Sequence, residues 1–418
     1  MENIRCRNCE NELTYTFADL GASPLCNEII EPQELNSGQR SYPLHAYVCD
    51  KCFLVQVGAS ICPEEIYADY SYFSSYSDSW LKHAERYVEM MIKNYELNQS
   101  SFVTEIASND GYLLQYFKER DIPILGVEPS GTVAEAAIEK NIPTEKVFFG
   151  EQSAKKLKNS YRPADLILGN NVLAHVPDIH DFINGLGEML NEKGIMTFEF
   201  PHLMQLIDNN QFDTIYHEHF FYYSLHAVQT IFKNHGFRIF DIQELSTHGG
   251  SIRIFVTREA NKAYGESNKV RELLALEKEK GYLDVNLYTR FEENIQQTKR
   301  ELLSLLINLK NNDKTIIGYG APGKGNTLLN YCGIGTDLLN YTVDRSPYKQ
   351  DHYLPGSLIP IHYPDKIMET KPDYVLILPW NLKNEIMPQI NYISEWGGKF
   401  IIPIPKPTVI SPCKLEGA

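Results

Sequence analysis

The feature that most constrains this fold is an alternation of short apolar segments with helical stretches. Residues 102–107, 124–129, 166–172 and 194–200 are rich in Val, Ile, Leu and Phe, and helical spacing separates them. Strands that alternate with helices form a doubly wound, mostly parallel sheet. We therefore expect an α/β fold with ligands at the carboxyl ends of its strands.

A second α/β unit is expected in the C-terminal quarter of the chain. An apolar stripe at helical spacing runs through residues 266–310, which we interpret as a long helix or a pair of helices between domains. Residues 315–325 then have the pattern of an apolar strand ending in a glycine-rich turn, and 341–344 and 374–378 predict later strands. A chain of 418 residues is long enough for several separate cores.

Four of the eight cysteines form two Cys-x2-Cys pairs near the N-terminus. Two thiolates at this spacing can bind one side of a tetrahedral zinc ion, and a second pair completes the site. Four sulfur ligands leave no position for water, so we expect structural zinc bound by Cys6, Cys9, Cys49 and Cys52. Four unrelated buried cysteines are the alternative, and we interpret Cys26 and Cys62 as core thiols of that kind.

The turn after the first predicted strand, residues 105–111, has small residues where a ligand could approach the backbone. Glu128 follows about twenty residues later, at the end of the next strand, where a carboxylate can accept hydrogen bonds from both ribose hydroxyls. These features suit NAD and S-adenosylmethionine equally.

Two further features favour S-adenosylmethionine. A dinucleotide site would place three glycines in the turn, whereas this acidic turn would repel phosphates and suits a sulfonium cation. Residues 170–178 resemble the segment that closes over the donor in methyltransferases of this fold. The residues that we expect to bind the cofactor are Glu105, Ile106, Ala107, Asn109, Asp110, Gly111, Glu128, Pro129, Asn170, Asn171 and Val172.

Residues 216–224 concentrate two imidazoles, one carboxylate and three phenols. Such a group can remove a proton and stabilise the negative charge that results. Metal binding by residues 217–219 is an alternative, but neighbouring side chains on a strand point in opposite directions. We interpret residues 220–223 as core aromatics, and His180 and His202 as surface or hydrogen-bonded core histidines.

The order of the motifs resembles one family. The cysteine pairs are followed by residues 105–111, 170–178, 216–224, 248–253 and 318–326. Over essentially the full length they are similar to the sugar C-methyltransferases that act on dTDP-linked 4-keto-6-deoxy sugars, as in tetronitrose biosynthesis. The resemblance implies a zinc-binding domain (1–75), an S-adenosylmethionine-dependent methyltransferase domain (76–265), a helical connection (266–310) and a C-terminal Rossmann-like domain (311–418).

The resemblance also implies a mechanism, in which a base removes the proton from sugar C-3, next to the C-4 ketone, and the enolate carbon takes the donor methyl group. The catalytic residues implied in this way are His219, Glu218, Tyr216, His175 and a further tyrosine, Tyr70 or, as the second choice, Tyr72. His219 would be the base, with Glu218 orienting it or contacting the sugar. Tyr216 and His175 would donate hydrogen bonds to the enolate oxygen.

The glycines after residue 317 resemble a dinucleotide fingerprint, and amides at a helix N-terminus bind anions. A second cofactor there would make the protein a redox enzyme, whereas the family resemblance favours a pyrophosphate clamp for a nucleotide sugar. A relic of gene duplication that binds nothing is the third interpretation. The residues that we expect to contact the substrate are Gly320, Gly323, Lys324, Gly325, Asn326 and Asp344.

Composition narrows the remaining choices. A formal net charge of −15 argues against a nucleic-acid-binding protein. No apolar run is long enough to span a membrane, and the first residues lack the apolar core of a signal peptide, so we expect a cytoplasmic monomer or small homo-oligomer.

We therefore expect a C-methyltransferase of a nucleotide-linked keto-deoxysugar, with dTDP as the nucleotide. Three alternatives stay open. They are an O-methyltransferase of a sugar or small metabolite, an NAD-dependent sugar-nucleotide oxidoreductase, and a zinc-knuckle interaction protein that has lost its donor.

Overall fold

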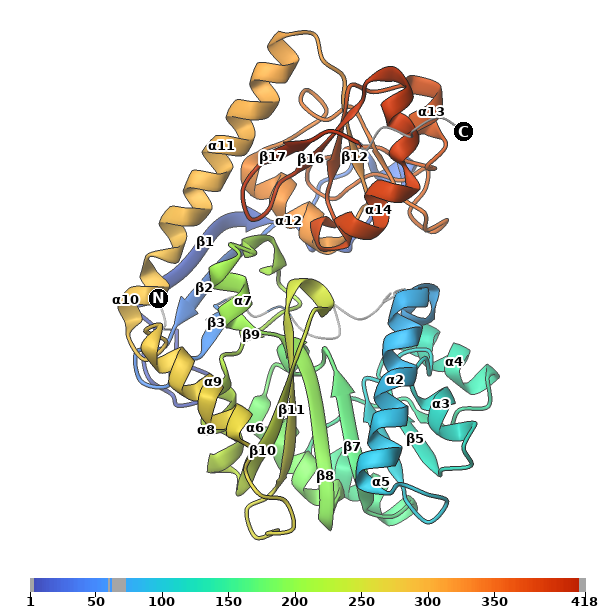
Figure 1. Ribbon diagram of the computed structural model, residues 1–418, viewed down its shortest axis with the longest axis vertical. Helices are drawn as coiled ribbons and strands as arrows, with labels where there is room; N and C mark the ends of the chain where they lie inside the picture. The colour runs from blue at the N-terminus through green and yellow to red at the C-terminus, as the bar shows by residue number, and fades with distance from the viewer. Residues whose placement is uncertain (1–3, 59–60, 62–72, 413–418) are drawn as a thin grey trace.

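The computed structural model describes residues 4–58, 61 and 73–412, which form three β-sheets (Figure 1). A seven-stranded sheet lies at one end of the molecule and a six-stranded sheet at the other. A four-stranded sheet and the long helix α11 (Phe291–Asn311) connect them along one side. Three residues that the sequence singled out, Cys62, Tyr70 and Tyr72, lie outside the described residues.

The seven-stranded sheet has the order β10-β11-β8-β7-β4-β5-β6. Strands β4 to β8 pair in parallel, and β11 runs antiparallel to both of its neighbours. Its strands are almost wholly buried, as is typical of a sheet covered by helices on both faces. The predicted doubly wound α/β sheet is therefore confirmed. The strands are β4 (Val103–Ile106), β5 (Ile124–Val127), β6 (Thr144–Glu145), β7 (Ala164–Asn170), β8 (Leu190–Pro201), β10 (Phe237–Leu245) and β11 (Ser251–Arg258).

The helices of this region alternate with its strands, as the apolar periodicity predicts. The first begins where the Ser77 hydroxyl accepts the backbone N–H of Trp80, and its buried face consists of Ala84, Tyr87, Val88 and Met91. The helices are α2 (Asp78–Tyr95), α3 (Leu114–Lys118), α4 (Gly131–Glu139), α5 (Glu151–Ser160), α6 (Ile179–Met189), α7 (Leu203–Asp208) and α8 (Leu225–Asn234).

The four-stranded sheet joins two segments that are far apart in the sequence. Strands β1 (Tyr15–Ser23), β2 (Tyr42–Val48) and β3 (Val55–Val57) are followed at the sheet's edge by β9 (Phe221–Tyr222). The strand β9 thus takes residues that we placed in the methyltransferase domain into the sheet of the cysteine-rich segment.

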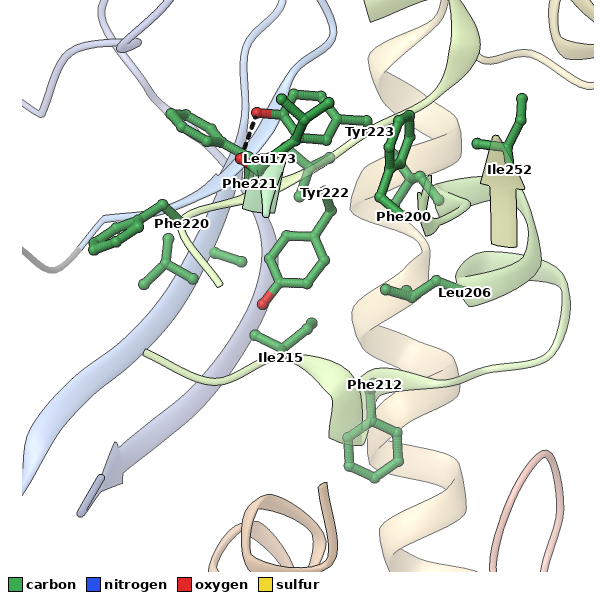
Figure 2. Packing of buried hydrophobic residues seen from close by; sticks show 14 of the residues in the cluster. Leu173, Phe200, Leu206, Phe212, Ile215, Phe220, Phe221, Tyr222, Tyr223 and Ile252 are labelled. Atoms are coloured by element: carbon green, nitrogen blue, oxygen red, sulfur yellow. Dashed lines mark hydrogen bonds between the residues drawn. The ribbon is translucent and has the colours of Figure 1, made fainter. Parts of the chain in front are cut away.

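The aromatic run that contains β9 belongs to the core, as predicted. Phe220, Phe221, Tyr222 and Tyr223 are all buried, and Figure 2 shows them among apolar side chains from several elements. The Tyr223 hydroxyl donates to the carbonyl of Leu173 at 3.1 Å. The hydrogen bond satisfies the polar end of a side chain that is otherwise packed against apolar neighbours.

The connection consists of three helices, whereas we expected one or two: α9 (Asn268–Glu279), α10 (Val285–Thr289) and α11. Gly281 has a φ of 92°, and the Asp284 carboxylate caps α10, so the chain turns between α9 and α10. The ring of Phe291, at the start of α11, stacks on Phe17 of β1 with centroids 4.7 Å apart. The helices therefore brace the four-stranded sheet.

Two buried ionisable groups attach α9 to the seven-stranded sheet. The Glu277 carboxylate contacts His202 Nε2 at 2.8 Å and accepts the backbone N–H groups of Leu225 and His226, at the start of α8. His202 is thus a hydrogen-bonded core histidine, as we interpreted it.

The six-stranded sheet has the order β14-β13-β12-β15-β16-β17 and is parallel except for its last pair. Helix α12 follows β12 directly and lies toward the four-stranded sheet (Figure 1). The elements are β12 (Ile316–Tyr319), α12 (Gly323–Cys332), β13 (Thr342–Val343), β14 (Ile361–His362), α13 (Lys366–Thr370), β15 (Tyr374–Ile377), α14 (Lys383–Gln389), β16 (Lys399–Ile402) and β17 (Thr408–Ile410).

Candidate active site

The four cysteines of the two pairs converge on one point. Sulfur atoms of Cys6, Cys9, Cys49 and Cys52 approach to 3.5–3.7 Å, and all four lie within 4.8 Å of one another. Sulfurs bound tetrahedrally to zinc at its usual distance would be about 3.8 Å apart, so the arrangement fits the ion. The four cysteines therefore have the geometry of the structural zinc site that their spacing predicts.

Both cysteine pairs use the same backbone turn. The N–H of Glu10 donates to the carbonyl of Cys6, and the N–H of Phe53 donates to the carbonyl of Cys49, each at 2.9 Å. Glu10 and Phe53 have φ values of 59° and 55°, which brings the chain round after the second cysteine of each pair. Local sequence therefore shapes each half of the zinc site.

The turn after β4 has the shape of a ligand cradle. Ala107, Asn109 and Gly111 all have positive φ, between 51° and 75°. A Cβ atom at Gly111 would lie 2.3 Å from Ile142 Cδ1, so only glycine fits there. Glu128, at the end of β5, accepts the N–H groups of Asn109 and Ser130, each at 2.9 Å. We expected the Glu128 carboxylate to bind ribose. It also accepts hydrogen bonds that hold the turn itself.

Glu105 is the least satisfied group in this cradle. Its side chain is fully buried, and neither carboxylate oxygen has a hydrogen-bond partner in the described part of the chain. Burial raises the pKa of Glu105 well above its usual range, and Asp110 and Glu128 raise it further. Two unpaired acceptors among three acids suit a cationic ligand with hydrogen-bond donors, so these residues fit S-adenosylmethionine.

The remaining predicted cofactor residues lie at the same edge of the sheet. Asn170, at the end of β7, donates to the Tyr112 hydroxyl at 3.3 Å, and Asn171 has a φ of 56°. Sequence reasoning missed the segment before α2, where the backbone N–H of Ser74 donates to Asn109 at 2.9 Å and the Ser75 hydroxyl bonds the Asp110 carboxylate. Ile106 is the last residue of β4, and Pro129 lies two residues after the end of β5, so both lie at the same edge of the sheet.

Three of the predicted catalytic side chains come together. The His219 ring lies 4.0 Å from the Tyr216 ring and 4.7 Å from the His175 ring, between centroids. Residues 216–219 form a turn and not a strand, because the N–H of His219 donates to the carbonyl of Tyr216 at 2.9 Å. A second backbone bond, from Phe220 to Ala174 at 2.7 Å, holds this turn against the segment after β7.

The proton on His219 can be assigned from its partner. Nδ1 lies 3.0 Å from the Thr214 carbonyl oxygen, which can only accept, so Nδ1 carries the hydrogen and Nε2 the lone pair. Burial lowers the pKa of His219 well below its usual value, and neighbouring His175, His248 and Lys324 lower it further. Burial also lowers the pKa of His175 to about 4. Both imidazoles are therefore neutral at physiological pH.

We expected Glu218 to orient His219 or to contact the sugar, and the structure gives its carboxylate other partners than His219. Its buried carboxylate accepts from Asn27 at 2.7 Å and from the thiol of Cys26 at 3.7 Å, both in the loop after β1. Burial raises the pKa of Glu218, an effect that these two donors oppose. The Thr214 carbonyl orients the His219 ring instead. The Glu218 side chain, although adjacent in the turn, is directed toward Asn27.

The glycines of the C-terminal turn allow close packing against neighbouring segments. A Cβ atom at Gly320 would lie 2.6 Å from Pro379, one at Gly323 would lie 2.8 Å from Cys26 Sγ, and one at Gly325 would lie 3.0 Å from Leu378. The protein itself occupies the space that these glycines leave. The predicted contact of this turn with a phosphate stays a prediction.

Two other predicted substrate residues are bound within the protein. Asn326 donates to the carbonyl of Cys26 at 2.5 Å. Asp344 accepts the N–H groups of Ala321 and Ser346, at 2.7 and 2.8 Å, so its carboxylate stabilises a turn. Lys324 is also bound within the protein, because its Nζ donates to Asn381 Oδ1 at 3.0 Å. Its half-buried ammonium in addition lowers the pKa values of His219 and His248.

Two residues near this site were missed altogether. Asp213 is fully buried in the short helix η4 (Phe212–Thr214), and its Oδ2 accepts from the Trp380 indole at 2.7 Å. Burial raises the pKa of Asp213 to about 6, although Lys324 and the indole oppose the shift. An isolated Asp and a Trp 167 positions apart leave no local signal in a sequence.

His248 is a further neighbour, in a motif that carried the family resemblance but had no assigned role. It has a φ of 52°, and Gly249 and Gly250 also have positive φ, so the turn is sharply bent. Its Nε2 lies 3.2 Å from Asn171 Nδ2, which ties the turn to the cofactor edge. Burial lowers the pKa of His248 to about 4.

A buried ion cluster lies behind His248. The Thr247 hydroxyl, His83 and Arg253 all bond Glu199, at the end of β8. Burial alone would raise the pKa of Glu199, but His83 and Arg253 hold it at about 2. Glu199 therefore keeps its negative charge. Its bond to the Thr247 hydroxyl fixes the turn that carries His248.

Comparisons with known proteins agree with these sites. Residues 6–67 match the family described as "Putative zinc binding domain", 81–242 match "Methyltransferase domain", and 246–405 match "C-methyltransferase C-terminal domain". The C-methyltransferase NovU of Streptomyces niveus is 33% identical over 406 residues, which are 97% of this chain and 96% of that protein.

Solved structures show weaker likeness. Magnesium protoporphyrin IX methyltransferase of Synechocystis, with bound SAH, is 14% identical and superposes with a TM-score of 0.35. The match covers 47% of this chain and 91% of that protein's chain. An S-adenosylmethionine-dependent methyltransferase of Anabaena variabilis gives 0.37 at 14% identity, with coverages of 47% and 91%. Among the described residues, no helix has both the length and the apolar character to cross a bilayer.

The full-length match to NovU and the three domain matches coincide with a four-sulfur site, a cradle suited to the methyl donor and a histidine cluster beside it. The chain belongs to the zinc-containing, S-adenosylmethionine-dependent C-methyltransferases.

Proposed function

We propose that the protein methylates C-3 of a nucleotide-linked 4-keto-deoxysugar, with His219 as the base. The observation that carries the proposal is the hydrogen bond from His219 Nδ1 to the Thr214 carbonyl. It leaves the lone pair on Nε2, in a cluster with His175 and Tyr216. A C-methyltransferase needs such a base, because carbon becomes nucleophilic only when it loses a proton.

The position of the cluster supports this role. His175 follows the cofactor residues Asn170 to Val172 at the end of β7, and β7 pairs with β4, which carries the donor cradle. The base and the cradle are therefore at the same carboxyl edge, where ligands of such sheets bind. When bound, S-adenosylmethionine supplies an electrophilic methyl group on a sulfonium.

The chemistry assigns each protein group a step. His219 Nε2 takes the proton from C-3, and the electrons of that C–H bond pass into an enolate whose negative charge rests on the ketone oxygen. Hydrogen bonds from Tyr216 and His175 to that oxygen lower the barrier. The enolate carbon would then form the new C–C bond as the methyl–sulfur bond of the donor breaks, so that S-adenosylhomocysteine is the leaving group and the ketone is restored. The proton stays on the imidazole until product leaves.

Electrostatics favours an anionic substrate. The Lys324 ammonium lies near His219 and His248, and Lys349 lies near Glu218. A diphosphate close to these groups would raise the depressed pKa of His219, which makes the imidazole a stronger base once substrate is present. The resemblance to sugar C-methyltransferases supports a nucleotide sugar, with dTDP as the expected nucleotide.

The test is methyl transfer to dTDP-4-keto-6-deoxyglucose from a donor labelled with ¹³C in its methyl group. NMR of the product locates the new methyl group, and we expect it on C-3. A methyl group on oxygen would establish the O-methyltransferase alternative, and turnover of NAD without methyl transfer would establish the oxidoreductase.

A second measurement isolates the proton step. With S-adenosylhomocysteine in place of the donor, C-3 hydrogen should exchange with deuterated water in the native enzyme and not in His219→Ala. Equal exchange in both would remove His219 from the role of base. Exchange with no methyl transfer from intact donor would overturn the assignment of this sugar as substrate.

A further inference from the structure

The C-terminal domain holds η4, the segment next to the proposed base, by two contacts. Phe212 packs edge-on against the Tyr331 ring of α12, with centroids 5.5 Å apart. Asp213 accepts the Trp380 indole N–H at 2.7 Å. In Figure 2, Phe212 lies on the far side of Ile215 from the aromatic run, within the same buried cluster.

The same segment holds the proposed base. Thr214 follows Asp213 directly, and its carbonyl accepts the Nδ1–H of His219 at 3.0 Å and the Tyr222 hydroxyl at 3.5 Å. The direction of this carbonyl fixes both the tautomer of His219 and the direction of its lone pair. Any movement of η4 is therefore transmitted to Nε2.

Asp213 depends on the indole because its surroundings offer little else. Its Oδ1 has no hydrogen-bond partner among the described residues, although it is buried. Two residues in turn lie close to the Trp380 ring: Lys324 Nζ lies 4.8 Å from its centroid, and a Cβ atom at Gly249 would lie 2.8 Å from its Cη2. The indole N–H thus has a fixed direction, and it is directed at Asp213.

We propose that Trp380 and Asp213 are positioning residues, through which the C-terminal domain sets the orientation of the catalytic histidine. The inference rests on the proposed role of His219. It gives the C-terminal domain a part in catalysis that does not require its glycine turn to bind a nucleotide. Neither residue touches the reacting atoms in this scheme, so both act through the Thr214 carbonyl.

The test is Trp380→Phe, which keeps a ring against Lys324 and Gly249 but removes the N–H donor. We expect kcat to fall about tenfold, the effect of losing one hydrogen bond to a charged group, with KM changed less than twofold. Trp396→Phe is the matched control, because its indole donates to the Pro372 carbonyl at 2.9 Å, away from η4. The control should keep native kcat.

Histidines labelled with ¹⁵N give a readout that is independent of turnover. The His219 signal, identified by its absence in His219→Ala, should show the proton on Nδ1 in the native protein and a mixture of tautomers in Trp380→Phe. An unchanged tautomer together with native kcat would overturn the proposal, as would equal losses of kcat in Trp380→Phe and Trp396→Phe.

A second pair of variants covers the case in which Trp380→Phe folds poorly. Asp213→Asn keeps an oxygen acceptor for the indole and should keep most activity, whereas Asp213→Ala should lose about as much as Trp380→Phe. Native activity in Asp213→Ala overturns the proposal. If His219→Ala itself stays active, the proposed function fails; if only the Trp380 and Asp213 variants stay active, the positioning role fails alone.

Discussion

The two ends of the β1–β2 hairpin carry sites of opposite character. At one end, where Tyr15 pairs with Val48, four sulfurs converge to bind zinc. At the other end, beyond Ser23, the loop supplies Cys26 and Asn27 to the buried carboxylate of Glu218. One hairpin thus connects a site that holds the fold together with the wall of a site that performs chemistry.

The difference lies in how completely each site satisfies its own groups. The zinc site has four thiol ligands on local turns, and backbone and side-chain N–H groups bond two of the sulfurs, so its own groups are satisfied once the ion binds. The histidine site and its cradle keep Glu105 and the Oδ1 of Asp213 without partners among the described residues. Such groups cost stability, and proteins retain them where a ligand or a reaction uses them. We therefore expect substitutions at the two ends to act on different properties.

The largest effect on stability should follow removal of a zinc ligand. Cys6→Ser should lose the ion, and because structural zinc contributes about 10 kcal/mol or more to small domains, the thermal unfolding temperature should fall strongly. Elemental analysis should give one zinc per chain in the native protein. Cys26→Ser is the control, because Cys26 lies outside the cluster and its loss should leave zinc content unchanged.

Zinc in both variants, or in neither, would break the division between the two ends. Full zinc content in Cys6→Ser would mean that the ion does not need four sulfurs. Loss of zinc in Cys26→Ser would mean that the far end of the hairpin controls the metal.

The largest effect on turnover should come from the site at the other end of the hairpin. His219→Ala should lower kcat by about 10²–10⁴-fold, the usual contribution of a general base, with the unfolding temperature nearly unchanged. His217→Ala is the matched control: its Nε2 lies 3.2 Å from the Tyr42 carbonyl oxygen, and its ring packs against Tyr42. It should lose stability and keep most of its turnover. The reverse pattern would exchange the two roles.

These two sites also differ in how far the sequence predicts them. Cys-x2-Cys spacing encodes half of the zinc site in four residues, and the turns at Glu10 and Phe53 are local. The alternation of strands and helices likewise predicts the large sheet, because its periodicity is a local property. Burial and apolar pattern also predict residues 220–223 as core.

The rest of the catalytic site depends on contacts that no local pattern encodes. Glu218 is bonded by Asn27, 191 positions away, and Asp213 by Trp380, 167 positions away. The glycines after residue 317 show a different limit: their pattern predicts a phosphate site, which stays a prediction, and the structure adds only that Pro379, Cys26 and Leu378 lie where their side chains would be. A glycine permits close approach without specifying what approaches.

Removal of a single hydrogen bond at each end of the hairpin should have a smaller effect on stability, and the effect should differ between the two ends. Asn27→Ala leaves the buried Glu218 with one donor fewer, which should cost about 1–3 kcal/mol and raise the pKa of Glu218 further. Asn11→Ala removes a bond of equal length, 2.7 Å, to Asp50 at the zinc end, where water can replace it, together with a longer contact of 3.9 Å to Cys49 Sγ. Urea unfolding should show a loss of less than about 0.5 kcal/mol for Asn11→Ala. Equal losses would mean that both ends are equally accessible to water.

An effect of similar size should appear only when the pH is changed, as a difference in the pH dependence of stability at Asp213. Burial raises its pKa to about 6 in the folded chain, against about 3.9 in the unfolded chain. Between these values the folded state holds a proton that the unfolded state has released, so native stability falls as pH rises through this window. Asp213→Asn has no such proton and still offers an oxygen to Trp380. Relative to this variant, the native protein should therefore lose about 2 kcal/mol of stability between pH 4 and pH 7, measured by urea unfolding.

Zinc ligands protonate alike in both chains, so their contribution cancels in the difference. Parallel curves would mean that Asp213 is ionised without cost, and that Lys324 compensates its charge despite the unpaired Oδ1.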